Sequence, residues 1–223
     1  MTASEQLFQV YCAERGYAFT PIPVVPNSGR FPDYDVRTPN GSLICEVKEI
    51  TPNEQDKTFQ AKMTKYGEAD YSRAIGRRAR SSLREAREQL RRYEEDSRPC
   101  VLVLFDTTSG DYLSPNDLDA AMFGQPIVLF PEEAHSRLHG AEFTHGGDRR
   151  LTDKRSLYIG ALAVLLPARR ESAIRLDIYH NPFTAKAVRP AYFQHPSDRH
   201  FLKDGHPDEA GHGWCEYVGP RTV

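Results

Sequence analysis

An uninterrupted apolar run from Cys100 to Phe105 places the strongest constraint on how this chain of 223 residues can fold. Pro99 precedes the run and Asp106 follows it, and its length suits a single β-strand. Because neither face of such a strand is polar, both faces must be covered, which places the strand inside a sheet. We therefore expect an α/β or α+β fold built around a mixed central sheet.

Two extended runs, residues 34–37 and 43–50, precede this strand. Residues 38–42, Thr-Pro-Asn-Gly-Ser, are typical of a turn, so the two runs predict a hairpin. The two-residue period of a strand places Glu46 and Lys48 on the same face of the second run, among apolar neighbours. A carboxylate and an ammonium group in such surroundings require partners.

Other carboxylates are expected close to this pair. Asp33 and Asp35 share a face of the first run, and a hairpin brings them near Glu46. Carboxylate oxygens are suitable ligands for a hard divalent cation, and the Lys48 ammonium group can act on water or an oxyanion. These side chains predict cleavage of phosphodiester bonds. The alternatives are a turn-forming role for Asp33 and a structural ion pair between Glu46 and Lys48.

The spacing of these residues resembles a known signature. Pro32-Asp33 is followed, after twelve residues, by Glu46-Val47-Lys48, which looks like the PD-(D/E)xK motif. The superfamily with this motif includes many restriction endonucleases, Holliday-junction resolvases and repair exonucleases. The resemblance covers residues 4–106 and implies a restriction-endonuclease-like core, with the element order αβββαβ, in residues 1–110.

The resemblance also implies roles for the residues of the motif. Asp33, Glu46 and the carbonyl group of Val47 would bind Mg²⁺ or Mn²⁺. Lys48 would orient the attacking water or stabilise the charge that develops on the phosphate oxygens. The predicted activity is metal-dependent hydrolysis of nucleic acid, with DNA as the expected substrate.

Two further carboxylates are candidate catalytic residues. The sequence predicts a first helix over residues 3–15, because Gly16 can end it. In resolvase-like members of the superfamily a glutamate near the start of this helix often reaches the metal site, and Glu5 occupies the matching position. The alternative is that Glu5 completes a capping box with Thr2. Asp35 is the second auxiliary candidate, and its alternative is an ordinary polar strand residue.

A long polar segment follows the hairpin. Residues 54–95 contain no proline and predict one or two helices with a break between Gly67 and Gly76. In the second part, residues 74–94, apolar side chains recur at helical spacing, so this helix is expected to pack on the sheet. Residues 62–92 contain ten Lys or Arg against four Asp or Glu, a net charge of +6.

This basic helix is a candidate surface for nucleic acid, because arginine forms bidentate contacts with phosphate. The candidate contact residues are Arg77, Arg84, Arg87 and Arg91. Gln89 and Tyr93 form a Gln-x-x-x-Tyr pair that resembles a motif of exonuclease-type members of the superfamily, where it helps to position the DNA backbone. The alternative is a solvated helix with ion pairs between residues four apart.

The second half of the chain is less informative. Its apolar patterns predict strands at residues 126–130, 157–166 and 173–179. Within residues 111–189, these strands are expected to extend the same sheet or to form a small attached layer. Residues 132–155 predict a loop or a short helix, because they are rich in His, Gly and Arg.

Residues 190–223 predict an irregular C-terminal arm, because prolines and glycines are frequent there. We expect the arm to pack its aromatic residues against the domain, namely Tyr192, Phe193, Phe201 and Trp214. His206, His212 and Cys215 could bind zinc, although their spacing matches no closed zinc site. A metal-binding interaction protein centred on this arm is therefore a third hypothesis.

Composition limits the remaining classes. The net charge of −2 argues against a wholly basic coat protein for nucleic acid. No apolar run is long enough to span a membrane, and no secretory signal is visible, so four widely spaced free cysteines indicate a reducing cytoplasm. The alternative to a nuclease is a catalytically silent nuclease-like fold that binds nucleic acid or a protein in a defence or repair complex. A homodimer is also left open.

Overall fold

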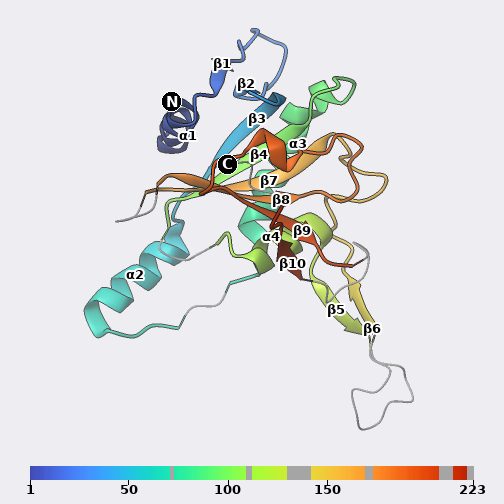
Figure 1. The fold of residues 1–223 in the computed structure, drawn as a ribbon. Helices are drawn as coiled ribbons and strands as arrows, with labels where there is room; N and C mark the ends of the chain where they lie inside the picture. Colours follow the sequence, from blue (N-terminus) through green and yellow to red (C-terminus); the bar gives the residue numbers. More distant parts are fainter. Residues whose placement is uncertain (71–72, 109–111, 130–141, 169–172, 206–212, 220–223) are drawn as a thin grey trace.

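The computed structural model describes residues 1–70, 73–108, 112–129, 142–168, 173–205 and 213–219. These residues form a mixed α/β fold with an eight-stranded sheet, a two-stranded sheet and four α-helices (Figure 1). The strands of the main sheet, in spatial order, are β1 (Ala18–Pro21), β2 (Tyr34–Thr38), β3 (Gly41–Ile50), β4 (Cys100–Asp106), β7 (Ile159–Leu166), β8 (Arg175–His180), β9 (Arg199–Lys203) and β10 (Trp214–Glu216). The α-helices are α1 (Ala3–Glu14), α2 (Glu54–Tyr66), α3 (Arg77–Leu90) and α4 (Pro115–Phe123).

The centre of the main sheet is parallel. β4 pairs in parallel with β3 on one side and with β7 on the other. The apolar run that predicted a covered strand therefore lies inside the sheet, as expected. β2 and β3 form the predicted antiparallel hairpin, in which Thr38 pairs with Gly41.

The order of the N-terminal elements is α1-β1-β2-β3-α2-α3-β4. This is the expected αβββαβ order, with the helical part divided into two helices. β1 is a four-residue edge strand that pairs only with β2 among the described strands. Gly16 follows α1 with a φ of +66°, a backbone conformation that favours glycine and confirms the predicted end of this helix.

Helices cover the two faces of the sheet. On one face, Phe8 and Tyr11 of α1 pack in a cluster with Leu43 and Val47 of β3. On the other face, α3 and α4 pack in a cluster that includes Ile44. Side chains alternate between the two faces of β3, as the sequence predicted. Glu46 and Lys48 therefore share the face of Ile44, which is the face that α3 covers.

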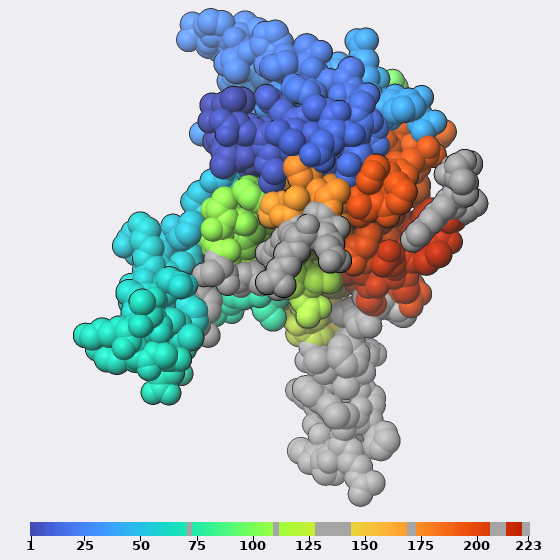
Figure 2. Space-filling model, turned by 60° about the vertical axis from the view of Figure 1, so that its left-hand side comes forward, coloured from blue at the N-terminus to red at the C-terminus, as the bar shows by residue number. Residues whose placement is uncertain are grey.

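The polar segment after β3 divides where its glycines indicated. α2 ends at Gly67, and α3 begins after Gly76. α2 has no buried residue, and it projects from the body of the protein (Figures 1 and 2). α3 packs on the sheet, but Ile75, which the sequence placed on its apolar side, is 47% exposed because the helix begins only at Arg77.

The second half of the chain differs from the prediction in several elements. β7 and β8 extend the main sheet, whereas β5 (Pro126–Leu129) pairs with β6 (Glu142–His145) in the separate two-stranded sheet. β6 lies within the segment predicted as a loop or short helix, and α4 was not predicted. A strand as short as β6 contains too few residues to show an alternation of apolar and polar side chains. Its extended conformation depends on the strand with which it pairs, so the local sequence does not predict it.

The C-terminal arm is not irregular throughout. β9 joins β8 in parallel, and β10 pairs with β9, so both strands belong to the main sheet. The predicted aromatic packing is confirmed, since Tyr192, Phe193, Phe201 and Trp214 all contact the core clusters. Three of the four cysteines are buried and Cys215 is exposed, and all four are free thiols. No helix in the described part of the chain is long and apolar enough to cross a membrane.

Candidate active site

Glu46 and Lys48 form the centre of the candidate site. Both side chains point toward α3 from β3, and Lys48 Nζ lies 2.6 Å from Glu46 Oε1. The Glu46 side chain is 1% exposed and the Lys48 side chain is 22% exposed. The carboxylate is therefore inside the protein, while the ammonium group retains access to solvent.

Asp33 is held beside this pair by the backbone of β3. Its Oδ2 accepts a hydrogen bond from the Val47 N–H at 2.7 Å, and its own N–H donates to Cys45 O at 3.1 Å. Because the N–H and C=O groups of a strand residue point to the same side, the Val47 carbonyl also faces the side of the strand on which Asp33 lies. The three oxygen donors predicted from the motif therefore come from adjacent parts of the structure.

Burial and mutual repulsion change the protonation of the two carboxyl groups. Burial, followed by the charge of Asp33, raises the pKa of Glu46 to about 7, against the opposing effects of Lys48 and Gln89. Burial also raises the pKa of Asp33, which the Val47 N–H partly offsets. No hydrogen bond of ordinary geometry reaches the Glu46 carboxylate among the described residues, although Lys48 at 2.6 Å and Gln89 lie close enough to lower its pKa.

Gln89 reaches the same site from α3. Its Nε2 donates a hydrogen bond to Phe31 O at 2.8 Å, just before the hairpin, and the residue is 5% exposed. Its Oε1 is buried without a hydrogen-bond partner in the described structure, and the side chain is close enough to Glu46 to lower the pKa of that carboxyl group. The structure therefore places Gln89 beside Glu46, whereas the motif implied only that it helps to position the DNA backbone.

Tyr93 and Asp35 belong to a neighbouring group of residues. Asp35 Oδ2 accepts a hydrogen bond from Arg98 Nη1 at 2.6 Å, and the Arg98 guanidinium also binds Asp96. Tyr93 is half-buried, and its ring centroid lies 5.8 Å from the Arg98 guanidinium carbon. Asp35 thus has a structural cation as its partner. Sequence reasoning missed Arg98, because a contact across 63 positions leaves no local pattern.

Glu5 forms the capping box that was its alternative role. Its carboxylate accepts a hydrogen bond from Thr2 N at 2.8 Å, and Thr2 Oγ1 accepts one from Glu5 N at 3.2 Å. The charge of Glu5 nevertheless contributes to the raised pKa of Asp33. Glu5 is therefore within electrostatic reach of the site while its carboxylate caps α1.

The arginines of α3 do not share a side of the helix with Gln89. Arg87 is two positions from Gln89, which corresponds to about 200° around the helix axis, and Arg91 begins the short 3-10 helix that follows α3. Arg77, Arg84 and Arg91 are exposed, and Arg87 is half-buried. A nucleic acid held by these arginines would therefore contact the flank of α3 opposite to Gln89.

The donor set fits a hard cation in its chemistry. Two carboxylates and a backbone carbonyl offer oxygen ligands, and the oxygens of Glu46 accept no hydrogen bond of ordinary geometry within the described structure. The described residues contain no group of three or more His, Cys, Asp or Glu side chains that could hold a metal ion. The third protein ligand would accordingly be the Val47 carbonyl. For the zinc hypothesis, His206 and His212 lie outside the described residues.

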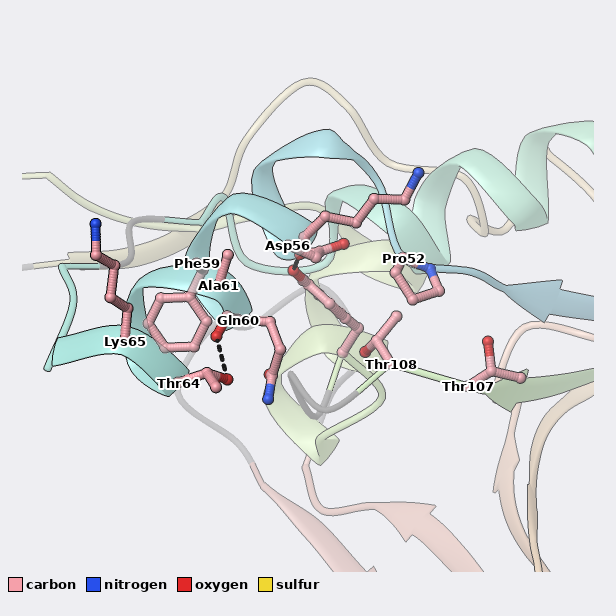
Figure 3. A pocket seen from close by; sticks show the side chains of 11 residues that line it. Pro52, Asp56, Phe59, Gln60, Ala61, Thr64, Lys65, Thr107 and Thr108 are labelled. Atoms are coloured by element: carbon pink, nitrogen blue, oxygen red, sulfur yellow. Dashed lines mark hydrogen bonds between the residues drawn. The ribbon is translucent and has the colours of Figure 1, made fainter. Parts of the chain in front are cut away.

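A large pocket lies elsewhere. It has a volume of about 1030 Å³ and lies between α2 and the segment that follows β4 (Figure 3). Phe59 and Thr64 line it from the helix, and Thr107 and Tyr112 line it from the opposite side. Its lining does not include Asp33, Glu46 or Lys48, and no sequence pattern indicated it.

Comparison with known proteins does not assign the chain to a family. No protein-family model, no curated protein and no solved structure matches it.

Proposed function

We propose that this protein is a metal-dependent nuclease of the PD-(D/E)xK type. The observation that carries the proposal is the position of Glu46, which is buried close to Asp33 and 2.6 Å from the Lys48 ammonium group. A structural ion pair needs one carboxylate and gains from hydrogen bonds to both of its oxygens. Here two neighbouring carboxyl groups make each other's charged form less favourable. A cation that binds between them would offset this repulsion, so it explains the arrangement better than a structural ion pair does.

The cation would be Mg²⁺ or Mn²⁺, held by Asp33, Glu46 and the Val47 carbonyl. When bound, it would polarise the scissile phosphate and lower the pKa of a bound water. Its binding requires both carboxyl groups in their charged forms, and the proton on Glu46 leaves as the pH rises through about 7. We therefore expect cleavage to increase with pH across this range.

The remaining side chains act on the substrate. Lys48 can turn its partly exposed ammonium group toward a phosphate oxygen and stabilise the charge that develops there. Gln89 can bind a water or a backbone group through its unpaired Oε1, while its Nε2 stays fixed to Phe31. The substrate is nucleic acid, with DNA as the first choice for a test.

The experiment compares the wild-type protein with Glu46→Ala on plasmid and on single-stranded DNA, in Mg²⁺, in Mn²⁺ and in EDTA. Glu85→Ala, on the exposed side of α3, is the control. We expect cleavage that requires the cation, that persists in the control and that is lost in Glu46→Ala. Absence of cleavage by folded wild-type protein in every condition would refute the proposal.

A second candidate is a nuclease-like fold that only binds nucleic acid or a partner protein. It is favoured by the position of Arg87 on the flank of α3 away from Gln89, because a surface that only binds does not need to face the carboxylates. This candidate predicts DNA retention that neither EDTA nor Glu46→Ala affects, with no cleavage. The same experiment therefore separates the two.

A further inference from the structure

A second concentration of positive charge lies away from the carboxylates. Arg80, Arg84 and Arg87 lie on one side of α3, because residues three and four apart are neighbours on a helix. Arg150, in the segment that follows β6, is close to all three: burial is the main cause of its lowered pKa, and the charges of Arg80, Arg84 and Arg87 lower it further. We call these four residues the arginine cluster.

The two segments that carry the cluster are fixed to each other. The backbone N–H of Arg150 donates to Met122 O at the end of α4 at 3.0 Å. Arg80 Nη2 donates to Ala120 O on the same helix at 3.0 Å, and the Tyr158 hydroxyl donates to Arg87 O at 3.0 Å. The backbone segments that carry the guanidinium groups are therefore held in place relative to one another by hydrogen bonds.

Nearby acids balance only part of the charge of the cluster, chiefly Asp148, which raises the pKa of Arg150. Arg80 forms an ion pair with Asp148 at 3.3 Å, but no ion pair in the described structure includes Arg84, Arg87 or Arg150. The Nε atoms of Arg80, Arg87 and Arg150 are buried and have no hydrogen-bond partner among the described residues. Like charges held together in this way destabilise the free protein, unless an anion binds them.

We propose that the arginine cluster binds the phosphate backbone of a nucleic acid at a surface separate from the Asp33–Glu46 site. All four positions carry arginine, whose planar guanidinium group matches a phosphate better than the lysine ammonium group does. A row of arginines along a helix fits a polymer with regularly spaced charges. The separation follows from Gln89, which lies on the opposite flank of α3.

This surface extends the protein–nucleic acid contact beyond the residues that the sequence indicated, by adding Arg80 and Arg150. It requires no divalent cation and no cleavage. Its contacts are with phosphates, so it contributes affinity and orientation without sequence specificity.

The experiment measures binding of a short mixed-sequence DNA duplex in EDTA at several salt concentrations. The variants are Arg87→Ala, Arg150→Ala and the double variant, and the control is Arg37→Ala, an exposed arginine on β2. Removing one cluster arginine should make the plot of log K against log salt concentration less steep by about 0.9. At about 0.1 M salt, this change corresponds to binding that is roughly eightfold weaker. The control should bind like the wild type.

Thermal unfolding without DNA distinguishes a binding role from a structural one. Removing Arg150 from the cluster relieves repulsion, so Arg150→Ala should unfold at the same temperature as the wild type or at a higher one. A lower unfolding temperature would show that Arg150 is structural, and the exposed Arg84→Ala then provides the binding test. DNA binding that is unchanged in the double variant and in Arg84→Ala would overturn the proposal.

Two further measurements separate this proposal from others. If vesicles of acidic lipid or an acidic polypeptide bind through the same arginines and duplex DNA does not compete, the ligand is not nucleic acid and the proposal fails. Lys57→Ala, which removes an exposed lysine of α2, should retain full DNA binding in EDTA. If the wild type never cleaves DNA but binding depends on Arg87 and Arg150, the nuclease proposal fails and this one holds.

Discussion

Lys48 Nζ lies 2.6 Å from Oε1 of Glu46, two positions away on the same face of β3, and yet the pKa of that buried carboxyl group is raised to about 7. A buried carboxylate normally needs several donors to offset the loss of water. Here a second carboxyl group, that of Asp33, makes the charged form still less favourable. This arrangement stabilises the fold poorly and suits a site that accepts a cation.

The first prediction concerns the effect of Glu46 on stability. Its pKa of about 7 in the folded protein exceeds its ordinary value of 4.5, so the folded state binds the proton more tightly than the unfolded state does. The contribution of Glu46 to stability is therefore greatest below pH 4.5 and is lost as the pH rises through about 7. Glu46→Gln should remove this loss and stabilise the protein at pH 8 in EDTA by at most about 3 kcal/mol.

Urea unfolding of both proteins at a series of pH values measures this effect. Glu85→Gln, on the exposed side of α3, serves as the control and should follow the wild type. If Glu46 instead supports the fold through a structural ion pair with Lys48, Glu46→Gln will be less stable than the wild type at pH 8.

The second prediction concerns Lys48. Lys48→Ala should slow metal-dependent cleavage by about a hundredfold or more, because a group that stabilises the developing charge is lost. Far-ultraviolet circular dichroism and DNA binding in EDTA should stay near wild-type values. Lys57→Ala, which removes an exposed lysine from α2, is the matched control. Loss of folding in Lys48→Ala would assign the residue a structural role.

The sequence predicted the parts of this fold that local chemistry determines. The apolar run of β4 required a covered strand, and the glycines at 67 and 76 mark the observed break between α2 and α3. The two-residue period of β3 correctly placed Glu46 and Lys48 on one face. Periodicity and turn chemistry act over a few residues, and the sequence shows them directly.

Contacts between distant segments were not predictable in this way. Arg98 takes Asp35 as its partner across 63 positions, and Arg150 approaches Arg87 only because α3 and α4 pack together. β9 and β10 lie in a segment rich in proline and glycine, and β8 supplies the strand on which they pair. Such strands are stabilised by pairing with segments that are distant in the sequence, so a local sequence pattern does not reveal them.

The third prediction concerns Asp117, a 1% exposed residue of α4 that joins this helix to the segment before α3. Its carboxylate accepts hydrogen bonds from both terminal nitrogens of Arg73, from Gly76 N and from the Ser114 hydroxyl. Asp117→Asn removes the charge that these donors share and should destabilise the protein by about 3 kcal/mol in urea unfolding. Asp153→Asn, at an exposed position, should change stability by well under about 1 kcal/mol. Equal effects of the two variants would contradict this assignment.

The last prediction concerns two buried histidines that join β8 and β9. Phe193 O lies 3.0 Å from His200 Nε2, which must therefore carry a proton, so His200 Nδ1 accepts from His180 Nε2 at 2.9 Å. Burial, together with His200, lowers the pKa of His180 to about 4, below its ordinary 6.5. The unfolded state then binds the proton first, so stability should fall by at most about 3 kcal/mol as the pH decreases from 6.5 to 4. Urea unfolding of His180→Gln should show a smaller fall over this range, while His195→Gln, outside the pair, should follow the wild type. A fall of the same size in His180→Gln would show that other groups cause the acid sensitivity.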